Sequence, residues 1–219
     1  MSKKKISAAL VVVGFAVSGA LAGANSATAA KSQSPPPCFP NCAGADLSGG
    51  DYYKADMANG NFTNATVDQA NMAKSNLGSA IFTGATGSYF NAAGANLSGA
   101  DFSGATLPQA FFTKKASLKN ANLSGATMVP AQFGHARMQN ANLQGANLSG
   151  SGFWKANLSG ADLTDANLTD TYLKRTNFKG ANLTNANLAG ATHANTAKFK
   201  GATFNNTTCP DGTVTNTGC

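Results

Sequence analysis

The sequence lacks several residue types on which enzyme active sites depend. It contains no glutamate, and its 219 residues include only nine acidic side chains, two histidines and one tryptophan. No serine, histidine and aspartate, and no cysteine and histidine, are spaced as a catalytic set in a recognisable structural context. We therefore expect no enzymatic activity, no cofactor and no metal site.

Long apolar runs are also missing, except near the N-terminus. Residues 1–29 begin with Lys3, Lys4 and Lys5, continue with an apolar stretch and end in Ala27-Thr28-Ala29. This order is typical of a secretory signal peptide. A membrane anchor is the alternative, but the stretch falls short of the roughly 20 strongly apolar residues that a spanning helix prefers. The sequence predicts export to a periplasm, a lumen or the medium, with no stable membrane span after cleavage.

Cysteine is scarce, and the four cysteines form two pairs that are close in the sequence. Cys38 and Cys42 lie in CFPNC, and Cys209 and Cys219 lie in CPDGTVTNTGC. An even number of cysteines in an exported chain favours disulfides. A zinc site is the alternative, but neither histidine lies near a cysteine pair in the sequence. We expect two local disulfides, one at each end of the central region.

The central region, residues 45–205, repeats one pattern of five residues. A large apolar residue recurs at every fifth position, as in Leu47, Tyr52 and Met57, and a small residue, mostly alanine, precedes it by two positions. This period matches neither a straight strand nor an amphipathic helix. It fits short extended segments whose large and small residues face inward, joined by corners at which glycine is frequent.

The units ANLSG, ADLTD, ANLTD, ANLTN and ANLAG resemble the A-(D/N)-L-x-x consensus of the pentapeptide-repeat family. The resemblance covers Ala45 to about Phe204. It implies an all-β fold: a right-handed quadrilateral β-helix in a single domain, with about eight coils stacked roughly 4.8 Å apart. Residues 30–44, a linker with the first cysteine pair, and residues 206–219, a disulfide tail, would cap the two ends of this solenoid.

A four-sided coil predicts a period of 20 residues, which the core phenylalanines show. They are Phe62, Phe82 and Phe102, followed by Phe112, Phe133 and Phe153 once one inserted residue near position 114 is allowed for. We expect these rings to stack along one wall of a narrow core. We also expect residues 191–197, where His193 replaces an apolar residue, to form a loosened last coil.

Placing the sequence on four walls brings the cations to one edge of the coil. One corner column reads Lys54, Lys74, Gly94, Lys114, Lys115, His135, Lys155 and Arg175. The neighbouring positions add Lys119, Arg137, Lys174 and Lys179, together with Lys198 and Lys200. The outward aromatic residues of the same wall are Tyr53, Phe111, Trp154 and Tyr172. We call this whole set the basic-aromatic edge; most aspartates fall on the other two walls.

The basic-aromatic edge suggests a binding function. Like charges opposite each other on neighbouring strands are destabilising, so cations kept only for solubility would be better spread over four walls. A row of cations with interleaved aromatic rings suits a polyanion. The sequence therefore predicts an exported, non-enzymatic binding or scaffold module for an acidic envelope or extracellular polymer, with nucleic acid as a further possible polyanion. The alternative is a purely structural or protein-interaction solenoid with no polyanion ligand.

Two other functions are disfavoured. A regular hydroxyl column could order water for ice binding, but serine and threonine are typical of the family consensus at these positions: Thr63, Thr83, Ser103, Ser124, Thr164 and Thr184. Some pentapeptide-repeat proteins are acidic mimics of DNA that protect DNA gyrase. The basic edge and the signal peptide of this chain argue against that role.

Overall fold

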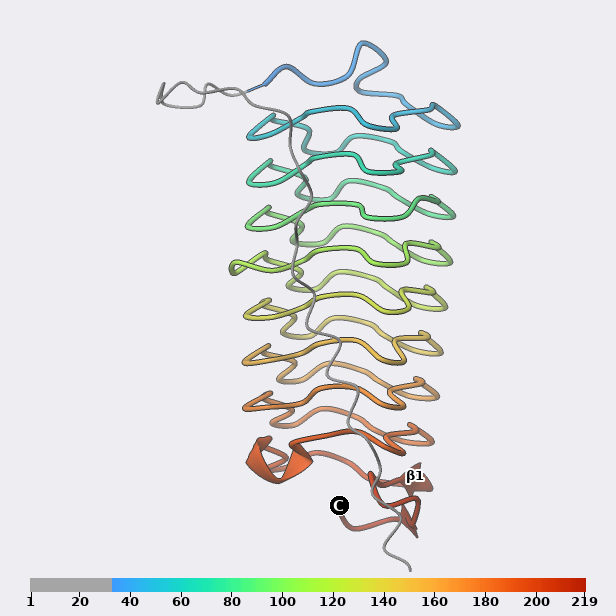
Figure 1. The fold of residues 1–219 in the computed structure, drawn as a ribbon, viewed down its shortest axis with the longest axis vertical. Coiled ribbons are helices and arrows are strands. Elements are labelled where there is room, and N and C mark those ends of the chain that lie inside the picture. Colours follow the sequence, from blue (N-terminus) through green and yellow to red (C-terminus); the bar gives the residue numbers. More distant parts are fainter. Residues whose placement is uncertain (1–32) are drawn as a thin grey trace, which may run out of the picture. The chain divides into compact units, whose positions relative to one another are not determined.

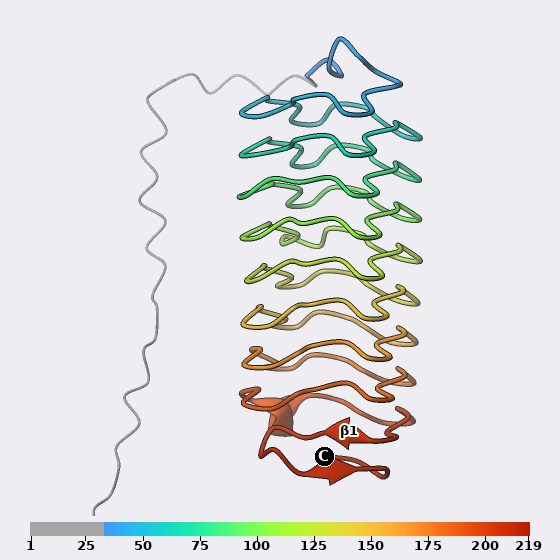
Figure 2. The same cartoon turned by 90° about the vertical axis from the view of Figure 1, so that its right-hand side faces the viewer.

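The structure is a computed structural model that describes residues 33–219, so the predicted signal peptide at residues 1–29 lies outside the described residues. Each five-residue unit is a short extended segment followed by a turn, and four units complete one coil (Figures 1 and 2). Parallel bridges join residues 20 or 21 positions apart, from Asn41 to Thr208. The described chain is thus the right-handed, four-sided β-helix that the sequence predicts.

The four walls are defined by the outward residues that pair between coils. Wall A runs from Asn41 to Thr203, wall B from Asp46 to Thr208, wall C from Asp51 to Thr192 and wall D from Asp56 to Lys198. Eight successive bridges connect the outward residues of wall A: Asn41, Asn61, Ile81, Asp101, Asn122, Asn142, Asp162, Asn182 and Thr203. This number of steps agrees with the predicted number of coils.

The corners explain why the repeat favours asparagine, aspartate and glycine. The N–H of Ala65 donates to the carbonyl of Phe62 at 3.0 Å and closes a four-residue turn, and Asn64 within it has a φ of 55°. A positive φ at this position defines a type II turn, which favours glycine or asparagine. Asn61 Oδ1 accepts the N–H of Thr63 at 3.1 Å, while its Nδ2 donates to Asn41 in the adjacent coil. One side chain therefore supports both its own turn and the stack.

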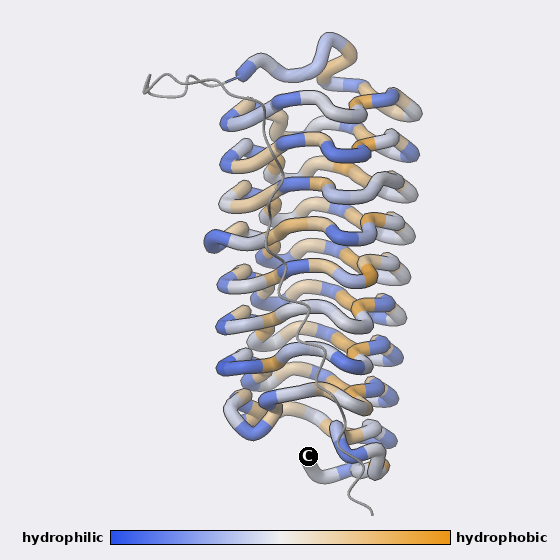
Figure 3. Tube along the Cα trace, viewed as in Figure 1, coloured by the Kyte–Doolittle hydropathy of each residue, from blue (hydrophilic) through white to orange (hydrophobic). Residues whose placement is uncertain are grey.

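The core is a column of apolar side chains, and Figure 3 shows hydrophobic and hydrophilic residues alternating along each coil. The rings of Phe62, Phe82 and Phe102 stack with centroids 4.8 Å apart. A second stack joins Phe112 to Phe133 at 5.2 Å and Phe133 to Phe153 at 4.9 Å. The expectation that both series share one wall is wrong. They lie on walls A and C, because Phe112 follows Phe102 by half a coil.

Residues 87–92 interrupt the repeat but keep the core filled. Gly87 and Ala92 stand where other units have a large residue, and Phe90 stands where they have alanine. Phe90 is fully buried, with its ring centroid 5.8 Å from that of Phe82 and 6.0 Å from that of Phe112. A Cβ on Gly87 would lie 2.5 Å from the backbone nitrogen of Asp68. The segment thus exchanges its large and small positions without leaving a void.

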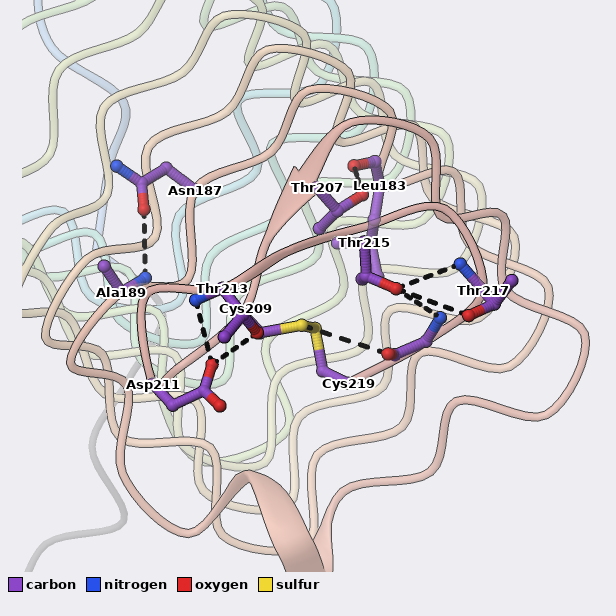
Figure 4. The surroundings of a disulfide bond; sticks show 11 residues. Leu183, Asn187, Ala189, Thr207, Cys209, Asp211, Thr213, Thr215, Thr217 and Cys219 are labelled. Atoms are coloured by element: carbon purple, nitrogen blue, oxygen red, sulfur yellow. Dashed lines mark hydrogen bonds between the residues drawn. A yellow bond between two sulfur atoms is a disulfide. The ribbon is translucent and has the colours of Figure 1, made fainter.

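Both ends of the described chain carry the predicted disulfides. Cys38 bonds to Cys42 and Cys209 bonds to Cys219, with Cα–Cα distances of 4.9 and 5.4 Å. At the C-terminus, β1 (Thr207–Thr208) and β2 (Val214–Thr215) form an antiparallel pair. The Thr207 hydroxyl donates to the Leu183 carbonyl of the preceding coil at 2.7 Å (Figure 4). The chain therefore covers its own last coil, which protects an otherwise open strand edge.

The segment before this cap departs from the repeat, as the sequence predicts. His193 is exposed with a φ of 60°, and a short 3-10 helix, η1 (Ala194–Thr196), follows it. Within residues 33–219, no helix is both long enough and apolar enough to cross a membrane.

The exchange at residues 87–92 leads to a stability prediction. Phe90→Ala should lower the free energy of unfolding by about 3–5 kcal/mol, because it leaves a cavity that small neighbours cannot fill. The double variant Phe90→Ala with Ala92→Leu has the usual order, a small residue followed two positions later by a large one. It should recover most of the lost free energy of unfolding. Urea unfolding followed by circular dichroism measures both effects. A double variant as unstable as Phe90→Ala would contradict the proposed exchange.

Candidate functional site: the basic-aromatic edge

The structure places the predicted cations along wall C, wall D and the corner between them. Seven side chains share that corner, all with positive φ: Lys54, Lys74, Lys114, Lys115, His135, Lys155 and Arg175. Lys119, Arg137, Lys179, Lys198 and Lys200 lie on wall D, and Lys174 lies on wall C. Lys174 and His135 are half-buried, and the other cations are exposed. Six aspartates belong to walls A and B and their corners: Asp46, Asp68, Asp101, Asp162, Asp165 and Asp170.

The corner between walls C and D is occupied by residues that its backbone conformation disfavours. At the corner between walls A and B, the positive-φ positions from Gly44 to Asn185 are all glycine, asparagine or aspartate. At the C–D corner, Gly94 is the one such residue between Lys54 and Arg175. The left-handed conformation costs an ordinary side chain roughly 1–2 kcal/mol, and stacked like charges add to that cost. The cations are therefore placed against local preference.

Tyr53 gathers the cations at the N-terminal part of this edge. Lys54 Nζ and Lys74 Nζ lie 5.3 and 5.5 Å from the centroid of its ring. A hydrogen bond with Lys74 lowers the pKa of the Tyr53 phenol, and the charges of Lys74, Lys54 and Lys114 act in the same direction. The positive potential of three coils thus converges on one aromatic ring.

Trp154 is the centre of a second cluster on the same edge. Its ring centroid lies 4.5 Å from that of His135 in an edge-on arrangement, and Lys155 Nζ lies 4.7 Å from the ring. The ring centroid of Tyr172 lies 4.7 Å from that of His193. Trp154 is 41% exposed and Tyr172 is 36% exposed. Both rings are held by neighbours and still present apolar surface to solvent.

A shallow hollow of about 470 Å³ opens beside this cluster. It is lined by Thr113, Lys114, Gln132, Gly134, His135, Gly152, Trp154 and Tyr172. Four of the predicted site residues meet here, namely Lys114, His135, Trp154 and Tyr172. Tyr53 and Phe111 do not line it, and Phe111 is half-buried on wall C. The sequence analysis did not single out Thr113, Gln132, Gly134 or Gly152 as site residues.

A signal for two of these missed residues, Gln132 and Gly152, is present in the outward column of wall C. Asn71 and Asn91 continue an amide ladder that starts at Asp51, with bonds of 2.8 and 3.1 Å. Beyond them the column reads Phe111, Gln132, Gly152 and Tyr172. In the same coils, amide ladders continue on the other walls, for example from Asn122 to Asn142 on wall A and from Asn147 to Asn167 on wall B. The second half of wall C therefore departs from the stabilising pattern beside the hollow.

On wall A, the carboxylate of Asp162 is bound by hydrogen bonds from its own wall. Burial raises the pKa of Asp162, but hydrogen bonds from Thr164, Gln144 and Asn182 outweigh it and leave the pKa below its usual value. This aspartate is thus part of the wall's own hydrogen-bond network. Among residues 33–219, no three histidine, cysteine or acidic side chains are grouped so that they could hold a metal ion.

Solenoids with this five-residue unit form a recognised class of repeat protein, and comparison identifies the family. The model of the family of pentapeptide repeats matches in eight copies, over residues 41–78, 80–114, 95–129, 116–154, 131–165 and 156–192. These matches cover more than half of the chain. The protein therefore belongs to the pentapeptide-repeat family.

Several solved structures are similar to this chain. HetL, a pentapeptide repeat protein involved in heterocyst differentiation regulation from the cyanobacterium Nostoc sp. strain PCC 7120, is 27% identical, with 80% of this chain and 87% of that chain covered and a TM-score of 0.48. A pentapeptide repeat protein from the Arabidopsis thaliana thylakoid lumen is 35% identical over 45% of this chain and 68% of that chain, with a TM-score of 0.42. QnrB1, a plasmid-mediated fluoroquinolone resistance protein, is 16% identical over 74% and 82%, with a TM-score of 0.40. No curated protein matches the sequence significantly.

The corner geometry predicts that its cations are not needed for folding. Arg175→Gly places glycine at a φ of 58° and should leave the free energy of unfolding unchanged or raise it by up to about 1 kcal/mol, because the left-handed strain disappears. Urea unfolding measures this change. A clear loss of stability would show that the guanidinium group supports the coil instead.

The lowered pKa of Asp162 predicts that its contribution to the free energy of unfolding is lost in acid. Because its pKa is lower in the folded state than the ordinary value of 3.8, its contribution is complete above that value and is lost as the pH falls through the folded pKa. Asp162→Asn should keep near-wild-type stability at pH 7, since Asn182 makes the equivalent bonds to Thr184. Unfolding midpoints between pH 2 and 7 should fall less steeply in the variant. Parallel pH profiles would disprove this role.

Proposed function

We propose that this protein is a non-enzymatic binding module that holds an acidic polymer along its basic-aromatic edge. The observation that carries the proposal is the column of cations at the C–D corner. These side chains occupy left-handed positions that the A–B corner gives only to glycine, asparagine or aspartate, and that the B–C corner fills with uncharged or acidic residues such as Gln69, Tyr89 and Asp170. A row of cations is thus particular to the C–D corner, which supports a binding role.

The spacing of the column suits a linear ligand. Stacked phenylalanines place neighbouring coils 4.8 to 5.2 Å apart, and the C–D corner presents a basic side chain in every coil from Lys54 to Arg175 except that of Gly94. An extended polyanion lying parallel to the coil axis would contact several cations at once. Each contact would release counterions, which makes the affinity dependent on salt.

The compartment helps to define the polymer. The two disulfides indicate an oxidising compartment, because cytosolic reductants keep such pairs reduced. Together with the signal-peptide pattern of residues 1–29, they support export. In that setting, the acidic polymers available are those of the cell envelope and its surroundings.

A second candidate is a structural or protein-interaction solenoid that uses other walls. Wall B favours it by presenting an uncharged row of exposed hydroxyl groups, those of Thr66, Thr86 and Thr106. A partner that docked on this row would be insensitive to charge changes at the C–D corner. The experiment below separates the two candidates.

The proposal predicts that the affinity for a polyanion falls with salt, and that this salt dependence is set by the cations at the C–D corner. Lys74→Gln with Arg175→Gln removes two corner cations outside the hollow. The slope of log affinity for inorganic polyphosphate against log salt concentration should then become shallower by about 1–2. Isothermal titration calorimetry at several salt concentrations measures this slope.

The matched control changes the net charge equally at other corners. Asn64→Asp with Gln109→Glu also lowers the net charge by two, at positions with φ values of 55° and 59°. This variant should keep the wild-type slope. Equal slopes for all three proteins, or equal losses in both variants, would reject the edge as a binding site. Failure of the wild type to bind polyphosphate would reject the proposal itself.

A further inference from the structure

The two glycines of the wall C hollow are not required by the backbone. Gly134 and Gly152 lack the positive φ that marks the corner glycines. A Cβ on Gly134 would have the Trp154 carbonyl oxygen as its nearest neighbour, at 3.9 Å. A Cβ on Gly152 would meet the amide end of Gln132, which is flexible. Gly152 lies in an extended segment, where glycine costs roughly 0.5–1 kcal/mol relative to alanine, and Gly134 lies in the turn that follows Phe133, at a position that Ser124 and Thr164 hold on wall A. Neither conformation nor close packing against backbone accounts for this cost.

What the two glycines do is leave the hollow open. In the wall A column, the position of Gly152 is held by Asn142 or Asp162, and that of Gly134 by Ser124 or Thr164. Those side chains form the ladders and turns that cover the other walls. Their absence at two successive coils of wall C exposes the floor between Gln132 and Tyr172. The hollow therefore exists because side chains typical of the repeat are missing.

The lining of the hollow has the chemistry of a site for a hydroxylated, acidic ring. Trp154 and Tyr172 offer apolar ring surface, which suits the C–H face of a sugar. The Thr113 hydroxyl and the Gln132 amide supply neutral donors and acceptors for ring hydroxyls. Lys114 lies at the same hollow and can face a carboxylate or sulfate. A few polar groups around aromatic surface are typical of small-ligand sites.

The arrangement favours a puckered ring over a flat nucleobase. His135 meets Trp154 at an interplanar angle of 78°, so these two rings form no parallel slot into which a base could slide. The hollow is wide and shallow, and its lining residues come from four successive coils. A non-planar ring with substituents on all sides uses such a surface more fully than a base edge does.

We infer that the wall C hollow binds one sugar-acid unit of an acidic polysaccharide, with the ring against Trp154 and Tyr172 and its acid group toward Lys114. This inference rests on the proposed function, because the corner cations would hold the rest of the polymer. It adds a preference for a class of polymer that charge alone does not give.

The test fills the hollow with a side chain that is typical of the repeat. Gly134→Ser should lower the affinity for oligogalacturonate about tenfold, the scale of one lost aromatic stacking contact. It should leave the affinity for inorganic polyphosphate, which has no rings, within about twofold. Because the chain has one tryptophan, the fluorescence of Trp154 reports directly on the hollow, and oligogalacturonate should change it saturably.

The matched control is Gly78→Ser, at the equivalent position of wall D. Gly78 also lacks a positive φ, and its Cβ would be in ordinary contact, 3.4 Å from Asn96 Nδ2. This variant should bind both polymers like the wild type. The midpoint of unfolding of Gly134→Ser should equal or exceed that of the wild type, which separates lost binding from lost folding.

Each other outcome decides against the inference in a distinct way. Binding of polyphosphate without binding of oligogalacturonate would keep the proposed function and overturn the sugar site. Equal losses for both polymers in Gly134→Ser would assign the effect to the charge column. Selective loss for a single-stranded oligonucleotide in place of oligogalacturonate would show a nucleobase site. Binding of neither polymer by the wild type would overturn the proposed function and the inference together.

Discussion

The structure depends on the parallel hydrogen-bond ladder that connects each coil to the next. The N–H of Phe62 donates to the carbonyl of Ile81 at 2.7 Å, and the N–H of Ile81 donates to the carbonyl of Gly60 at 2.8 Å. This alternation requires residues one coil apart to lie directly over each other. Each unit then has room for one large inward side chain, and Phe90 shows that its position can shift if the volume is kept.

Strict register also turns any recurring outward residue into a continuous column. The insertion at Lys114 and Lys115 illustrates this, because bridges change from a spacing of 20 at Asn91 and Phe111 to 21 at Asn96 and Ser117. Lys114 and Lys115 both have positive φ, 55° and 67°, so the corner absorbs the extra residue. The ladder continues unchanged, and the column gains a cation.

The ladder explains which features the sequence could predict. The resemblance to the pentapeptide-repeat family implied the β-helix, and the even number of cysteines in two local pairs favoured the disulfides. A fixed period relates position in the chain directly to position on a wall, so the cation column followed from counting. The hollow did not, because Gly134 and Gly152 matter through side chains that they lack, while most glycines of the repeat occupy corners. The two phenylalanine stacks were misplaced on one wall because a shared spacing of 20 residues does not show the half-coil offset between Phe102 and Phe112.

The same register sets the geometry of recognition. The corner cations and the exposed rings of Trp154 and Tyr172 belong to neighbouring columns that run in one direction, so a bound polymer would lie along the coil axis and not around it. Disulfide-linked segments lie at both ends of the described chain and give the column a fixed length. The number of ionic contacts therefore has an upper limit set by the number of coils. Under the proposed function, charge on a longer polymer would add no contact beyond that limit, and discrimination between polymers would then come from the hollow through the shape of the ring that it binds.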